Sequence, residues 1–576
     1  MKHSSYIFVL LLAALLTVSC QQKTDNIEIY ATTDLHGMLL PFDNTEGLPT
    51  GRSLANVASV VRSKGSTNIV LLDNGDILQG DPLAYYYNFI DTTREHVVAD
   101  ILNHLGYDAA TVGNHDIEAG HAVYDRVRRQ YNFPLLAANA VHTESGEPYF
   151  EPYTIIRKRG VKIAVFGLIT PSVPRWLPES LYEGIRFENM VETAARWMPL
   201  IKSENPDVIV GLFHSGMGDE DDTGEDENST VAVAVNVPGF DVIFCGHDHR
   251  QDVTEVTSVN GERVLILDGG SRAEALMNAT VSFSKNSDGT VEKKISGKVI
   301  PMDDLPESLA FIKRYSKVSD SLKAYTSEVI GNSTSSFGTR DAFFGPSAFV
   351  DLIHRMQLDI SGADISFAAP LSFDQSISEG ELRIRDMFRL YRFENFLYTV
   401  TMTGGEIDRH LEHAAGLWFD TMDDAGDYML RYRYDDNGKP VMINGTVRLR
   451  NPSYNFDSAM GIRYTIDVSK PQGERVFIIS LEDGTPFSHS STYSVAVNSY
   501  RANGGGGHFP AAGITNRELD RRIVSATERD LRYYMTEWIR ERATISPEPI
   551  TDWKIIPEEW ASEADDREMK LLFGDN

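Results

Sequence analysis

The sequence predicts two α/β domains joined by a helical linker. Between residues 27 and 300, short apolar runs alternate with amphipathic stretches, which is typical of a layered α/β sheet. A second region with mixed strand and helix patterns covers residues 335–545. Residues 301–334, between the two, are polar with helical spacing and predict a linker helix. The 576 residues are too many for one compact domain, in agreement with this division.

Composition and charge exclude several classes of protein. Hydrophobic residues make up 42% of the chain and charged residues 24%, which is ordinary for a globular protein and excludes disorder of the whole chain. The 83 acidic and 54 basic residues give a net charge of −29, so we expect no binding of nucleic-acid polymers. A small anionic substrate remains possible, because bound metal ions can reverse the local charge. The two cysteines, Cys20 and Cys245, are too few for a disulfide scaffold.

The N-terminus predicts export. Lys2 and His3 precede an apolar run over residues 7–16, which is typical of a secretory signal and short for a transmembrane helix. The small residues just before Cys20 resemble a bacterial lipoprotein signal. This resemblance implies removal of residues 1–19, a lipid on Cys20 and a tether over residues 20–26. We therefore expect a lipid-anchored protein of the bacterial cell envelope, periplasmic or surface-exposed, that contacts the membrane only through this lipid.

The first region supplies the strands and helices of the expected sheet. The strand candidates are residues 27–31, 68–72, 109–112, 162–169, 207–213 and 241–245, with later strands at 263–268 and 277–284. Helical patterns lie between several of them, at residues 54–62, 96–105 and 191–201.

Polar side chains follow five of these strands closely. They are Asp34 and His36, then Asp76, then Asn114, His115 and Asp116, then His214, and finally His247 and His249. In an open α/β sheet, ligands bind beyond the carboxyl ends of the strands, so these residues can converge on one edge. Carboxylate, amide and imidazole donors without thiolate suit Zn, Mn, Fe, Co or Ni. There are enough donors for two cations, which a bridging carboxylate would hold about 3.5–4 Å apart.

Taken in order, the five blocks resemble the signature of the calcineurin-like metallophosphoesterases. The resemblance covers residues 27–300 and implies a four-layer α/β/β/α sandwich with a centre of two divalent metal ions, such as Zn, Mn or Co. By position it assigns Asp34, His36, Asp76 and His249 to the first metal, and Asp76, Asn114, His214 and His247 to the second. Asp76 would bridge the two ions.

The same resemblance gives His115 a catalytic role. In the family, the residue at this position contacts a phosphate oxygen and stabilises the leaving group, and an acidic residue shortly after it orients the imidazole. Asp116 and Glu118 both fit this description, and the spacing favours Glu118. By contrast, Cys245 lies in an apolar strand and is expected to be a buried core thiol.

The second region predicts recognition of a base. It has a helical pattern at residues 347–356 and strands at 396–402 and 463–468. Phe393 and Asn395 stand in a Phe-x-Asn block, and Tyr500 precedes an Ala-x-Gly-Gly block. These blocks resemble the C-terminal substrate-binding domain of the 5′-nucleotidase family, a second α/β domain over residues 335–545. The resemblance implies that Phe393 and Tyr500 stack on a nucleobase, which makes nucleotides the expected substrates.

Several features decide between branches of that family. Many 5′-nucleotidases carry an acidic residue near the position of Gly506 and an arginine in a segment comparable to residues 368–372, and this sequence has neither. Residues 384–387, 454–457 and 498–502 instead resemble the 2′,3′-cyclic-nucleotide 2′-phosphodiesterase/3′-nucleotidase branch. We therefore expect that activity, releasing nucleoside and phosphate outside the cytoplasm. The alternatives are a 5′-nucleotidase, possibly also acting on nucleotide sugars, and a nucleotide-binding surface lipoprotein without activity.

Two further segments have weaker patterns. Residues 219–227 are strongly acidic, which favours a solvated loop or, alternatively, an accessory calcium site. From Pro547 the chain is rich in proline and charge, so we expect residues 546–576 to form a loosely packed C-terminal tail.

Overall fold

A computed structural model of the chain describes residues 25–220, 224, 226–286, 290–435, 438–443, 446–519 and 521–574. The expected signal peptide and Cys20 lie outside these residues. So do positions 221–223 and 225 of the acidic segment, which leaves the calcium alternative undescribed. Within the described ranges, no helix is both long and apolar enough to cross a membrane.

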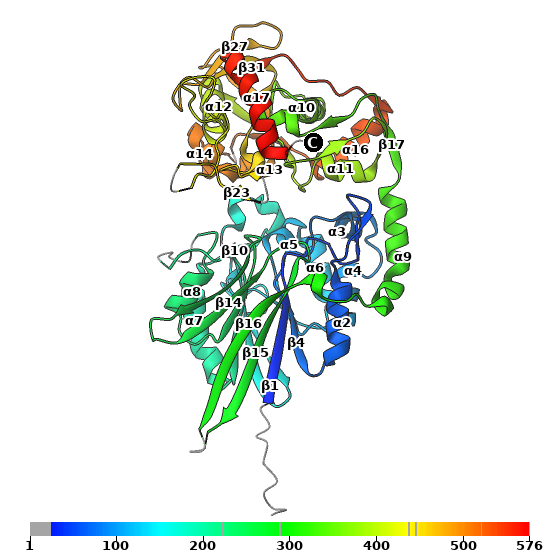
Figure 1. The fold of residues 1–576 in the computed structure, drawn as a ribbon, viewed down its shortest axis with the longest axis vertical. Helices are drawn as coiled ribbons and strands as arrows, with labels where there is room; N and C mark the ends of the chain where they lie inside the picture. Colours follow the sequence, from blue (N-terminus) through cyan, green and yellow to red (C-terminus); the bar gives the residue numbers. More distant parts are fainter. Residues whose placement is uncertain are drawn as a thin grey trace, which may run out of the picture.

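The first domain is a sandwich of two six-stranded sheets (Figure 1). The first sheet has the order β16 (Val291–Pro301), β15 (Ala275–Lys285), β1 (Asp25–Thr32), β4 (Ile69–Asp73), β5 (Ala109–Thr111) and β6 (Leu135–Leu136). The second has the order β13 (Gln251–Thr257), β14 (Arg263–Gly269), β12 (Val242–Cys245), β11 (Val208–His214), β9 (Val161–Ile169) and β8 (Tyr153–Lys158). Strands β1, β4, β5 and β6 are parallel, as are β9, β11, β12 and β14, so their carboxyl ends share one edge.

The two-residue period of a strand explains the layers. In β1, Ile27 and Ile29 face the second sheet and pack in one core cluster with Val210 and Phe244. Tyr30, the residue after Ile29, belongs to the cluster on the opposite face of the sheet. Because both faces of these strands are buried, both sheets need a covering layer of helices.

Helices cover the outer face of each sheet. The first sheet is covered by α2 (Leu54–Lys64), α4 (Val97–Leu105) and α6 (His121–Gln130), and the second by α7 (Met190–Ser203) and α8 (Thr230–Asn236). The helix α2 begins where the side chains of Ser53 and Asn56 form a capping box, and α4 ends at the left-handed Gly106. The predicted four-layer sandwich is confirmed, as are the strands and helices expected within it.

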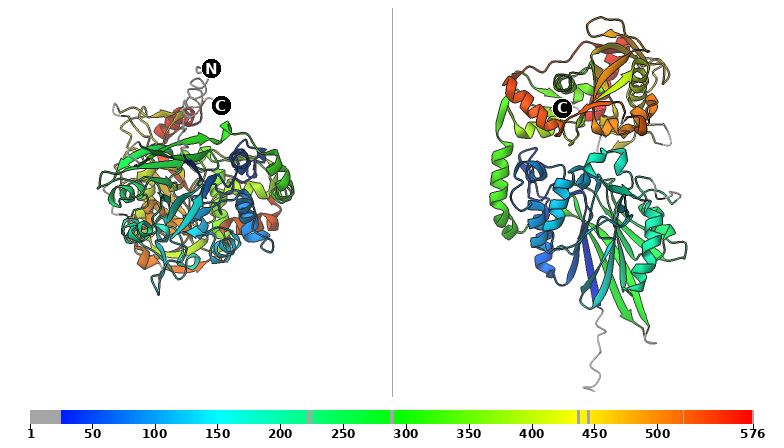
Figure 2. Two further views of the ribbon diagram at one scale, coloured as in Figure 1. Left: turned by 90° about the horizontal axis from the view of Figure 1, so that it is seen from below. Right: turned by 180° about the vertical axis from the view of Figure 1, so that it is seen from behind.

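The second domain is also α/β. Its central sheet has the order β25 (Ser458–Met460), β19 (Ile365–Ala368), β28 (Thr492–Asn498), β22 (Leu397–Thr403) and β29 (Ile523–Ala526). The predicted helix at 347–356 is α10 (Ala348–Ser361), and the predicted strand at 463–468 is β26 (Ile462–Asp467). Between the domains, α9 (Leu309–Thr326) runs along one side of the molecule (Figures 1 and 2).

The expectation of a loose C-terminal tail is wrong. Strand β31 (Trp553–Ile556) pairs with β26, and helix α17 (Glu558–Phe573) packs on the second domain. The buried Glu568 on this helix accepts hydrogen bonds from the backbone N–H groups of Met429 and Leu430 and from the hydroxyl of Tyr432. The charge-rich composition of this segment did not indicate these contacts, because a few apolar residues on one face of a helix are sufficient for packing.

The two domains meet through a buried polar contact. The hydroxyl of Tyr85, from the first domain, donates to Asp530 of the second at 2.9 Å. The guanidinium of Arg532 lies 4.0 Å from the ring centre of Phe388 and 5.1 Å from that of Tyr85. Beside them, both carboxylate oxygens of Glu394 are buried without a hydrogen-bond donor, and the nearest cation, Arg532, is 3.8 Å away.

This arrangement makes stability depend on pH. Burial raises the pKa of Glu394 to about 8, and Arg532 offsets burial only in part. Since the ordinary value is 4.5, the unfolded chain releases this proton at a lower pH than the folded chain. The contribution of Glu394 to stability is therefore full below pH 4.5 and is lost as the pH rises towards 8. The melting temperature of Glu394→Gln relative to the parent protein should rise steadily from pH 5 to pH 8. Parallel curves, or the same trend in the exposed control Glu379→Gln, would contradict this account.

Candidate functional site

The predicted ligands stand on tight turns at the carboxyl ends of both sheets. Asp34, His36, Asp76, His247 and His249 all have positive φ angles, between 46° and 82°. Such angles are uncommon outside glycine and cost free energy, so a cluster of them marks a site whose geometry is imposed by the surrounding structure. The first sheet supplies the two residues after β1 and the one after β4, and the second sheet supplies both residues after β12.

The first ligand group consists of Asp34, His36 and His249, with donor atoms within 4.8 Å of one another. The Nε2 atoms of His36 and His249 face each other at 3.0 Å, and His249 Nε2 is 3.5 Å from an oxygen of Asp34. The Nδ1 atom of His36 lies 3.2 Å from the backbone carbonyl oxygen of Gln79. This second contact fixes the ring with Nε2 directed into the group.

The second group consists of Asp76, His214 and His247, again within 4.8 Å. Nε2 of His214 is 3.2 Å from Asp76 and 3.1 Å from the amide oxygen of Asn114. The backbone carbonyl of Asn74 accepts a hydrogen bond from His214 Nδ1 at 2.7 Å, which leaves Nε2 unprotonated in the neutral ring. The structure thus brings all seven predicted ligands together.

Asp76 is a member of the second group, and its charge also acts on His36 in the first group. Asp76 is fully buried, yet one of its carboxylate oxygens has no hydrogen-bond donor. Burial alone would lower the pKa of His214, but Asp76 raises it to about 10. A buried carboxylate without a donor, with imidazole nitrogens facing each other, is the arrangement that a cation would complete. The residues therefore fit metal ions.

His115 lies beside the ligands. Its ring centre is 5.3 Å from that of His36, and its Nδ1 is 2.5 Å from Glu118. The carboxylate of Asp116 accepts backbone N–H groups instead, including those of Asp76 and Gly113. Of the two acidic candidates, the geometry gives Glu118 the contact with the imidazole and Asp116 a role in holding the turns. Burial would lower the pKa of His115, but Asp76 and Glu118 raise it to about 9.

In the second domain, three aromatic rings lie together. The ring centres of Phe393 and Tyr454 are 6.0 Å apart and those of Tyr454 and Tyr500 are 6.2 Å apart, both pairs nearly perpendicular. We call Phe393, Tyr454 and Tyr500 the aromatic slot. The third sequence candidate, Asn395, is buried, and its amide lies 3.4 Å from the hydroxyl of Tyr391.

The buried Arg501 holds this slot in place. It forms a bidentate ion pair with Asp457 at 2.8 and 3.0 Å. It also donates to the backbone carbonyls of Tyr454 and Gly505, both at 2.5 Å. The arginine therefore ties together the backbone on two sides of the aromatic slot. A further histidine–carboxylate group, His410, Asp457 and His508, has metal-like spacing, but this arginine already occupies both oxygens of Asp457.

The structure explains why residue 506 is a glycine. Its φ of +71° is strained for any other residue, and a Cβ atom there would lie 2.3 Å from Arg501 Nη1 and 2.5 Å from the amide oxygen of Asn455. No side chain fits at this position while Arg501 keeps its contacts. The lack of an acidic residue at 506 is thus part of how this pocket is built.

The aromatic slot adjoins the metal ligands in this structure. The Trp176 ring lies 5.4 Å from the His247 ring, and its backbone carbonyl accepts a hydrogen bond of 3.4 Å from Asn503, in the glycine-rich loop. Glu227 lies 3.0 Å from Nε2 of His247. These contacts bring the glycine-rich loop after Tyr500 beside the segment of Trp176, which packs on His247.

Sequence reasoning missed several of these contacts. The contact of Glu227 with His247 could not be predicted, because Glu227 is one of several acidic residues in the segment 219–227 and no motif relates its position to His247. Asn74 and Gln79 act through backbone or local contacts, and Trp176 lies in an irregular segment. Tyr454 could have been found, because its block was already singled out.

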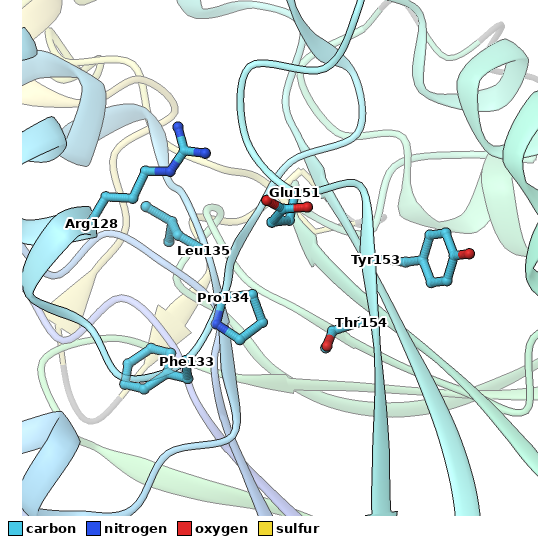
Figure 3. Close-up of a pocket in the computed structure, with 7 residues that line it drawn as sticks. All are labelled: Arg128, Phe133, Pro134, Leu135, Glu151, Tyr153 and Thr154. Atoms are coloured by element: carbon cyan, nitrogen blue, oxygen red, sulfur yellow. The ribbon is translucent and has the colours of Figure 1, made fainter.

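A separate depression of about 430 Å³ lies where the edge strands β6 and β8 approach each other (Figure 3). It is lined by Arg128, Phe133, Pro134, Leu135, Glu151, Tyr153 and Thr154. None of the predicted site residues lines it, and one carboxylate is too few to hold a metal ion.

The fold and the ligand set define a metal-dependent phosphoester hydrolase, and the chain is a hydrolase of the metallophosphoesterase family. Residues 27–251 match the calcineurin-like phosphoesterase family, and residues 325–513 match the 5′-nucleotidase C-terminal domain. The chain therefore has the domain pair of the 5′-nucleotidase family and belongs to it.

Known relatives are distant. The chain is 27% identical to the trifunctional nucleotide phosphoesterase YfkN of Bacillus subtilis over 92% of its own length, but spans only 39% of that protein. It is 26% identical to the 2′,3′-cyclic-nucleotide 2′-phosphodiesterase/3′-nucleotidase of Haemophilus influenzae, over 95% of this chain and 90% of that one. A 5′-nucleotidase precursor from Thermus thermophilus has the same fold, with a TM-score of 0.62 and 20% identity over 92% of this chain and all of that one.

Proposed function

We propose that this protein is a 2′,3′-cyclic-nucleotide 2′-phosphodiesterase and 3′-nucleotidase. It opens the cyclic phosphate and then removes the remaining 3′-phosphate, releasing a nucleoside. The observation that carries this choice over a 5′-nucleotidase is the exclusion of any side chain at Gly506 by Arg501. The names of full-length relatives from Haemophilus, Yersinia and Salmonella, 25–26% identical over 94–95% of this chain, support it.

The chemistry follows from the two ligand groups. Two divalent metal ions held by these groups would lower the pKa of a water molecule and bind phosphate oxygens. Asp76, which the family resemblance assigns to both metals, would be shared by the two groups, and the backbone turns keep the ligands preorganised. His115, whose Nδ1 contacts the carboxylate of Glu118, would hold a proton for the departing ribose oxygen. Phe393 and Tyr500 position the base, so that the phosphate is presented to the ligand groups.

The direct test is phosphate release from 2′,3′-cyclic AMP, 3′-AMP and 5′-AMP by the metal-loaded protein. We expect kcat/KM to be highest for the first two substrates. A higher value for 5′-AMP would overturn the proposal in favour of a 5′-nucleotidase. Activity on none of the three would leave the hydrolase class in place and reject nucleotides of this kind as substrates.

Base stacking gives a separate prediction. Tyr500→Ala should raise KM for 3′-AMP about 5- to 150-fold, because stacking a base on one aromatic ring contributes ~1–3 kcal/mol. A small aryl phosphate, which has no base, should be hydrolysed as before. The exposed Tyr434→Ala serves as the control. An equal loss for both substrates would show that Tyr500 supports the fold of the site and does not stack on a base.

We also propose that the chain is exported and anchored by a lipid on Cys20. The support is the sequence pattern of the first 20 residues. Metabolic labelling with palmitate should mark the parent protein, and Cys20→Ser should remove both the label and the membrane association. Labelling that persists in this variant would contradict the anchor.

A further inference from the structure

A cavity of about 410 Å³ lies where the two domains meet. Its volume is within the range of small-molecule sites, roughly 300–1,000 Å³. Arg272 from the first domain and Arg389 and Arg392 from the second line it, together with Asp43, Glu46 and Asp374. The cavity is therefore lined by three arginines and three carboxylates.

One arginine of the cavity takes no part in the ion pairs around it. Each lining carboxylate has an arginine partner: Asp43 with Arg272 at 3.2 Å, Glu46 with Arg389 at 3.0 Å, and Asp374 with Arg340 at 2.8 Å. Among the residues that the structure describes, no carboxylate lies within ion-pair distance of Arg392. The free positive charge of the cavity is therefore the Arg392 guanidinium.

Arg392 is exposed to solvent and faces the same cavity as Arg272. The surrounding protein and Arg272 lower the pKa of Arg392, whereas Tyr454 and Asp43 raise it. Two guanidinium groups that face one cavity repel each other, and an anion between them would remove this cost. The planar fork of arginine matches the oxygens of a phosphate group.

The cavity borders the metal ligands. Gly80 lines it, and a Cβ atom on this residue would lie 2.7 Å from the carbonyl oxygen of His36. The backbone N–H of Arg272 donates to the carbonyl of Asp34 at 2.8 Å. The wall of the cavity is thus continuous with the turns that carry two of the ligands.

Arg392 connects the cavity with the aromatic slot, because it lines the cavity, directly precedes Phe393 and interacts electrostatically with Tyr454. With a base in the slot and a 2′- or 3′-phosphate at the metal ligands, the 5′ substituent of the ribose is the exocyclic group that neither of these sites holds. We propose that this cavity binds a second phosphate at that 5′ position, held by Arg392 and Arg272. The substrate class is then nucleotides phosphorylated at both ends of the ribose, such as nucleoside 3′,5′-bisphosphates. This inference rests on the proposed function for the identity of the cleaved phosphate.

The test compares two substrates that differ only in the 5′-phosphate. We would measure kcat/KM for release of the 3′-phosphate from adenosine 3′,5′-bisphosphate and from 3′-AMP. The parent protein should prefer the bisphosphate. Arg392→Ala should lower the ratio of the two values roughly ten- to a hundredfold, the usual effect of losing a hydrogen bond to a charged group. Arg392→Lys keeps the charge and should recover part of the ratio.

Arg385→Ala is the matched control. It removes the same charge from a neighbouring helix, α11 (Ile384–Leu390), but Arg385 bonds to Ser327 and does not line the cavity. It should leave the ratio unchanged. An equal loss of both substrates in Arg392→Ala would overturn the proposal, because it would place Arg392 on the cleaved phosphate or in the fold. A parent protein without preference for the bisphosphate would also overturn it, while leaving the 3′-nucleotidase assignment intact.

Calorimetric titration separates this inference from the proposed function. If the parent protein cleaves neither substrate, the proposed function fails, but the dissociation constants of the two compounds still report on the cavity. Tighter binding of the bisphosphate by the parent protein than by Arg392→Ala would support a phosphate site. Equal binding would reject it.

Discussion

Asp76→Asn is expected to abolish hydrolysis, with a fall in kcat of more than about 10³-fold. Asp76 is a fully buried carboxylate of the second ligand group whose charge also acts on His36 of the first. The asparagine has nearly the same shape but no charge, and each of its polar atoms makes a weaker metal ligand. Losing a single preorganised group at a transition state already costs ~10²–10³, and this change weakens two groups at once. Phosphate release and elemental analysis of the purified protein would measure both consequences.

The expected metal content of Asp76→Asn is below that of the parent protein. The exposed Asp483→Asn is the control for a change of one charge, and it should retain both metal and activity. Thermal melting would show whether the variant folds. A folded variant with full metal content and full activity would reject the bridging role of Asp76.

His115→Ala is the second change with a large expected effect. Its kcat for nucleotides should fall by ~10²–10⁴, the usual contribution of a general acid, with little change in KM. The reason is that the carboxylate of Glu118 lies 2.5 Å from Nδ1 of His115 and stabilises the protonated form of the imidazole. That proton neutralises the departing ribose oxygen.

The leaving group provides the sharper measurement. A nitrophenyl phosphate has a leaving group that departs without protonation, so His115→Ala should slow its hydrolysis much less than that of 3′-AMP. The exposed His489→Ala is the matched control. Equal losses for both substrates would mean that His115 acts on the phosphate oxygens or on the ligand His36 instead. Glu118→Gln should show a weaker version of the same selectivity, because it removes the charge from the partner of Nδ1.

Much of the fold could be predicted because its strands are short apolar runs with polar ends. The strands of the first domain are buried on both faces, so each is a nearly continuous apolar run. The same burial explains why the ligands could be found: a polar residue directly after such a run stands at the sheet edge. Asp34, Asp76 and His214 were each visible in this way.

Contacts between distant segments could not be predicted in the same way. The ion pair of Arg501 with Asp457 joins residues 44 positions apart, and the contact of Glu227 with His247 depends on how an acidic loop folds back. The docking of α17 and the buried Glu394 depend on surfaces that form only after folding. Such pairs have no periodic signal along the chain, since tertiary packing alone brings them together.

Gly506 and Arg501 also determine how this pocket can change during evolution. Introducing an acidic residue at position 506 alone would place its side chain against the guanidinium in a strained backbone conformation. Replacing Arg501 first would leave Asp457 as a buried charge without its main partner, a loss of about 3–5 kcal/mol. Both orders pass through a destabilised intermediate, so the two positions are epistatic. A lineage that acquires an acidic residue in this loop must change both positions together, or first gain stability elsewhere in the domain.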